Sequence, residues 1–85
     1  MLSTYEVLRN GPYVRVIIPE VLPPDWRALR EEVGGELEDG GVDRVSIVTP
    51  HFSYDRTDRE ALIELLHDLA REGVSTCIEW RDQDA

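Results

Sequence analysis

The chain has 85 residues, of which 41% are apolar, 32% charged and 7% aromatic. This length holds a single domain, 1–85, and no apolar run approaches the ~18 residues that span a bilayer, so we expect no membrane segment. Acidic residues number 18 against nine arginines and no lysine, and the net charge of −9 disfavours nucleic acid and anionic membrane surfaces as partners.

Two short strands are predicted near the N-terminus, at 5–9 and 13–18. Asn10-Gly11 between them tolerates the positive φ of a tight hairpin turn. Both alternating sets of side chains in 13–18 are mostly apolar, so we expect this strand to be buried on much of both faces. Pro19 ends it.

The first predicted helix begins at the Pro23-Pro24-Asp25 segment, because proline suits the first turn and an acidic residue there meets the positive end of the dipole. Gly34-Gly35 weakens its second half, and Gly40-Gly41 ends it. The apolar positions recur at helical spacing. They are Trp26, Leu29, Val33 and Leu37.

A strand at 43–49 leads through the loop 51–56 to a second helix. Thr57 and Glu60 match a capping box, in which Thr57 is the N-cap. Gly73 is placed to end the helix, and the last strand covers 74–80. One side of the helix is apolar, and that side consists of Ala61, Leu62, Leu65, Leu66, Leu69 and Ala70.

The order ββαβαβ predicts an α/β fold: a four-stranded mixed sheet with both helices on one face, a core over about 5–80 and a polar tail at 81–85. The other face would remain bare, and a partner or a second copy would dock there or at an edge strand. Cys77, the single cysteine, cannot form an intramolecular disulfide, so we expect a cytoplasmic protein in which Cys77 packs within the last strand.

The loop 51–58 gathers most of the polar side chains that could carry chemistry. His51 and Asp55 lack a third metal ligand, and His51, Ser53 and Asp55 lack the context of a hydrolase triad, so we expect no metal, no cofactor and no enzyme activity. We expect His67 to be a surface imidazole. Phosphate on Thr57 or Ser53 would suit a helix N-terminus; otherwise Thr57 is only a cap.

The element order, together with Tyr54-Asp55-Arg56-Thr57-Asp58 before a Leu-rich helix, resembles the STAS domain of anti-anti-sigma factors in a shortened form. In that family an Asp-Ser-x-Gly loop carries a phosphorylated serine. Asp55 matches its Asp, Arg56 stands at its Ser and Asp58 at its Gly, and Thr57 is the nearest hydroxyl. The resemblance implies a regulatory module that binds a protein partner, either a regulator or a kinase-like protein.

The sequence therefore predicts a non-catalytic protein–protein interaction module that uses the segment 51–60. Its contact residues would be Phe52, Tyr54, Asp55, Arg56, Thr57, Asp58 and Arg59. Two alternatives stay open. One is a small structural domain that forms a homodimer or larger homo-oligomer, and the other is an enzyme or small-molecule binder that uses the loop 51–58.

Overall fold

The computed structural model describes residues 4–19, 22–50 and 55–81. Within these ranges the predicted order ββαβαβ is confirmed. The strands and helices are β1 (Glu6–Asn10), β2 (Tyr13–Ile17), α1 (Trp26–Glu38), β3 (Arg44–Pro50), α2 (Arg56–Arg71) and β4 (Ser75–Arg81). Arg81, predicted to begin the polar tail, ends β4 instead.

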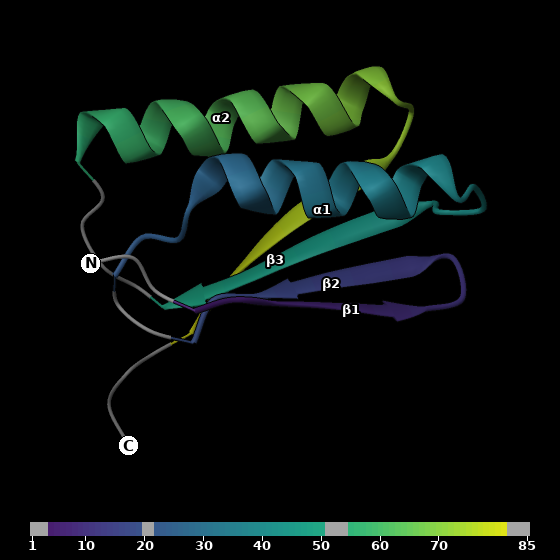
Figure 1. Ribbon diagram of the computed structural model, residues 1–85, viewed down its shortest axis with the longest axis horizontal. Coiled ribbons are helices and arrows are strands. Elements are labelled where there is room, and N and C mark those ends of the chain that lie inside the picture. The colour runs from purple at the N-terminus through teal and green to yellow at the C-terminus, as the bar shows by residue number, and fades with distance from the viewer. Residues whose placement is uncertain (1–3, 20–21, 51–54, 82–85) are drawn as a thin grey trace.

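The four strands lie side by side in their chain order, β1-β2-β3-β4. β1 and β2 form an antiparallel hairpin through Gly11, whose φ of 63° favours glycine, while β2, β3 and β4 are parallel. Both crossover connections therefore move across the sheet in the same direction. Since such connections are right-handed, both helices lie on the same face, as predicted (Figure 1).

The hydrophobic core cluster lies between that face and the helices. Val14 and Val16 of β2 and Val45 and Ile47 of β3 point to it and are 0–1% exposed. The alternate side chains of β2 point away from the helices, and there Arg15 is exposed. The prediction that β2 is buried on much of both faces is therefore wrong, because no described element covers the second face.

α1 packs on the sheet through an apolar stripe, and polar contacts join it to Tyr5, just before β1, and to Arg9 of β1. Leu29 and Val33 are buried, as the predicted stripe requires. The Tyr5 hydroxyl donates to Glu32 Oε1 over 3.1 Å. Partial burial raises the pKa of Tyr5, and the hydrogen bond to Glu32 and the negative charge of Glu32 raise it further. The phenol therefore stays protonated and can donate this hydrogen bond.

Both helix starts are capped by aspartate. The Asp25 carboxylate accepts hydrogen bonds from the backbone N–H groups of Arg27 and Ala28, each over 3.2 Å, so the two prolines precede the helix instead of forming its first turn. α1 ends as predicted before Gly40, whose φ is 83°. α2 ends before Gly73, whose φ is 78°. Ala70, predicted on the apolar side of α2, is exposed.

We predict that Gly34→Ala and Gly35→Ala each raise the free energy of unfolding by about 0.5 to 1 kcal/mol. A Cβ at either position meets nothing within 4 Å, so only the helix propensity changes. Urea unfolding followed by circular dichroism measures the effect. Gly73→Ala is the matched control and should destabilise by about 1 kcal/mol or more, because its φ is positive. Equal effects at all three positions would contradict this assignment.

Candidate functional site

The first turn of α2 differs from the predicted capping box. Asp55, not Thr57, is the N-cap, and its carboxylate accepts from the Asp58 backbone N–H over 2.8 Å. Glu60 does not reach back to the backbone but pairs with Arg56 Nε at 3.2 Å. The helix thus begins two residues earlier than predicted, since aspartate caps at least as well as threonine and Asp55 already has extended backbone geometry.

The predicted contact residues of this turn divide into two groups. Arg56, Thr57 and Arg59 are exposed, as is the cap Asp55. Asp58 is half-buried, and its Oδ1 accepts a hydrogen bond from Trp26 Nε1 over 2.8 Å. This bond joins the first turn of α2 to the first residue of α1. Four further predicted residues lie outside the described part of the chain: His51, Phe52, Ser53 and Tyr54.

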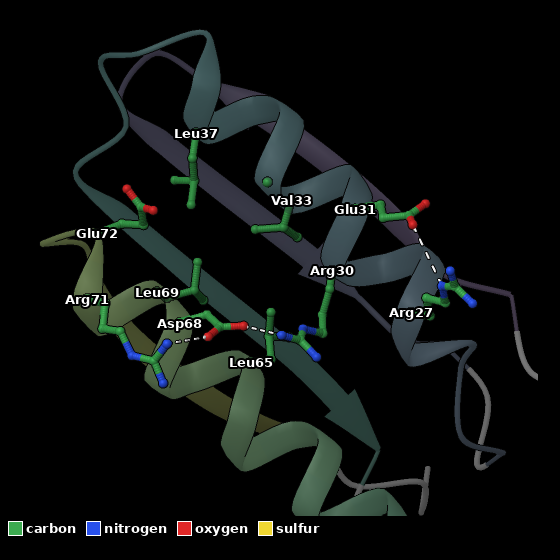
Figure 2. Close-up of a pocket in the computed structure, with 11 residues that line it drawn as sticks. Arg27, Arg30, Glu31, Val33, Leu37, Leu65, Asp68, Leu69, Arg71 and Glu72 are labelled. Atoms are coloured by element: carbon green, nitrogen blue, oxygen red, sulfur yellow. Dashed lines mark hydrogen bonds and ion pairs between the residues drawn. The ribbon is translucent and has the colours of Figure 1, made fainter.

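A groove of about 460 Å³ lies between α1 and α2, and the sequence did not indicate it. Its floor is apolar, with Val33 and Leu37 facing Leu69, and Gly34 contributes no side chain (Figure 2). Arg30 reaches across the groove to pair with Asp68 of α2. This ion pair joins the two helices over the apolar floor. The groove therefore belongs to the side of the sheet that carries α1 and α2, which we call the helical side.

The face of the sheet opposite the helices carries a mixed set of side chains. Alternation along the paired strands assigns it Glu6, Leu8, Asn10, Tyr13, Arg15, Ile17, Arg44, Ser46, Val48, Pro50, Ser75, Cys77, Glu79 and Arg81. We call it the open face. It contains a second hollow of about 420 Å³, lined in part by Arg15, Ile17 and Glu79. Leu8 is 49% exposed.

Three side chains from adjacent strands are joined by hydrogen bonds across the open face. The Tyr13 hydroxyl lies 2.7 Å from Ser46 Oγ, which lies 3.0 Å from Cys77 Sγ. Ser46 is fully buried by its neighbours although no described element covers it. Cys77 is exposed, so the prediction that it packs within the strand is wrong: the apolar pattern of β4 did not show which face the thiol occupies.

The arginines are paired unevenly over the surface. Arg9, Arg27, Arg30, Arg56 and Arg71 form ion pairs with acidic residues. Among the described residues, the other four form none. They are Arg15, Arg44 and Arg81 on the open face, and Arg59 in the first turn of α2. Both surfaces on which a partner was expected therefore hold cations without a counterion in the described part of the chain.

Within ranges 4–19, 22–50 and 55–81, no three histidine, cysteine or acidic side chains gather as metal ligands would. His67 is exposed on α2, as predicted. Neither helix combines the length and apolarity needed to cross a bilayer. Comparison with family models, with curated proteins and with solved structures found no match.

We predict that Asp55→Ala lowers the free energy of unfolding by about 1 kcal/mol, because it removes the N-cap acceptor. Asp55→Ser should keep most of the stability, since a hydroxyl also accepts from the helix backbone. Thr57→Ala, inside the first turn, should change it by less than about 0.5 kcal/mol. Thermal unfolding distinguishes the three, and a larger loss for Thr57→Ala than for Asp55→Ala would restore the capping box.

We also predict that the thiol of Cys77 reacts completely with a chromogenic thiol reagent in the folded protein. Its exposure makes unfolding unnecessary for access. The absorbance of the released chromophore, compared with and without denaturant, measures the accessible fraction. A native protein that reacts only after denaturant is added would show that Cys77 is buried after all.

Proposed function

We propose that this chain is a non-catalytic regulatory protein–protein interaction module of the kind that the STAS resemblance implies, located in the cytoplasm. It binds a protein partner through the segment 51–60, with Thr57 and Arg59 as the described side chains that meet the partner. Asp55 and Asp58 hold the turn in shape, and Thr57 is the described hydroxyl at which a phosphate would alter binding.

One observation supports this proposal: the first turn of α2 has exposed side chains, and hydrogen bonds fix the position of its backbone. Asp58 is bonded to Trp26 of α1, and Asp55 caps the helix. Arg59 is exposed and forms no ion pair with another described residue. Because the backbone of this turn is already ordered, only the side chain of Arg59 loses conformational freedom when it meets a carboxylate of a partner.

The second candidate function is a small homo-oligomerising domain. Two observations favour it. β1 and β4 are edge strands of the sheet, and Leu8 on β1 is 49% exposed. Unpaired strand edges and exposed apolar side chains are where a second copy of a chain pairs. A concentration series in light scattering distinguishes this candidate, because a homo-oligomer gains mass over the micromolar range and an interaction module remains a monomer.

The test of the interaction module is recovery of partners from a lysate of the source cell. The tagged wild type is compared with Thr57→Ala/Arg59→Glu and with Arg27→Glu, a charge reversal on the 91%-exposed side chain of α1. We expect at least one partner whose recovery falls about tenfold with the double variant and is unchanged with Arg27→Glu. Equal recovery by all three proteins, or no partner for the wild type, would refute the proposal.

A further inference from the structure

The open face differs in charge from the rest of the molecule. Arg15, Arg44 and Arg81 lie on it together with Glu6 and Glu79, so its described residues carry an excess of one positive charge. The chain as a whole has a net charge of −9, and its other described acidic residues lie on the helices, their caps and the loops. The described residues therefore form a strongly acidic side, which carries α1 and α2, and a weakly basic open face.

The cations of this face also form no ion pairs among the described residues, whereas all described arginines outside it except Arg59 do form them. Arg15, Arg44 and Arg81 come from three adjacent strands. Arg15 lies one same-face position further along the sheet than Arg44, and Arg81 lies at the opposite end from Arg44, paired with Pro50. Between them and along β1 lie apolar side chains, the half-exposed Ile17 and the 49%-exposed Leu8. Guanidinium groups towards both ends of the open face, with apolar side chains between and beside them, match an elongated acidic surface that has its own apolar stripe.

The topology indicates what shape that surface has. Parallel strands in proteins are generally covered by helices on both faces, and here β2, β3 and β4 are parallel with helices on one face only. An amphipathic helix is the element that completes this arrangement. A second copy of this chain is disfavoured as the occupant. It would place three arginines opposite three arginines, and both chains would have a net charge of −9, so the two would repel each other.

We infer that the open face binds an acidic amphipathic helix of a partner protein. The apolar stripe of that helix covers Leu8, Tyr13 and Ile17, and its carboxylates pair with Arg15, Arg44 and Arg81. This inference rests on the proposed function and adds to it a second surface, on the side of the sheet opposite the helices.

The test uses a designed helical peptide of about 18 residues with a leucine stripe and glutamate flanks. A peptide with lysine flanks and a scrambled glutamate peptide are its controls. Fluorescence anisotropy measures binding to the wild type, to Arg15→Glu/Arg81→Glu and to the matched charge reversal Arg27→Glu/Arg71→Glu on the helical side. Cys77 lies on the open face, so protection of its thiol from alkylation reports where the peptide binds.

We expect the glutamate peptide to bind the wild type at least tenfold more tightly than either control peptide and to slow alkylation of Cys77 at least fivefold. Binding should weaken at least tenfold in Arg15→Glu/Arg81→Glu and less than twofold in Arg27→Glu/Arg71→Glu. Circular dichroism verifies that both variants are folded.

Three results would overturn the inference: equal binding of the lysine peptide, an equal loss in both variants, or binding that leaves Cys77 unprotected. So would a stable dimer of the wild type that Arg15→Glu/Arg81→Glu dissociates, because a second copy would then be the occupant. None of these results bears on the first turn of α2, whose test is the recovery of partners with Thr57→Ala/Arg59→Glu. The two proposals therefore fail separately.

Discussion

The handedness of the two crossover connections is the constraint on which the rest of this structure depends. Each takes the chain from one parallel strand to the next in the same direction across the sheet, so each right-handed connection places its helix on the same side. One face of the sheet thereby receives both amphipathic helices and forms the core. The other receives none, and its exposed side chains, Arg15 and Leu8 among them, are a direct result of that topology.

The same arrangement puts the first turns of α1 and α2 at one end of the molecule, beside the carboxyl ends of the parallel strands (Figure 1). The Trp26 indole joins them by its hydrogen bond to Asp58. Further along, Arg30 pairs with Asp68 over the apolar groove (Figure 2). The helices are thus connected by polar contacts near their starts and at the groove, which holds the first turn of α2 in a defined position.

Charge follows the same division of the molecule. The helical side holds most of the acid, and its arginines are largely used in ion pairs; surface pairs of this kind add little stability and mainly moderate the repulsion between like charges. The open face has fewer charges, and its arginines form no ion pair among the described residues. The first turn of α2 and the open face therefore lie on different sides of the sheet.

Local patterns in the sequence determined the elements, because hydrophobic periodicity and turn glycines act within a few residues. They predicted the order ββαβαβ, the buried stripe of α1 and the helix end at Gly73. Tertiary structure decided what depends on distant segments. It exposed Cys77, left one side of β2 uncovered and formed the groove between the helices. It also joined Trp26 to Asp58, which are 32 residues apart. Alternation divides the residues of a strand into two sets, but only the packed helices decide which set is buried.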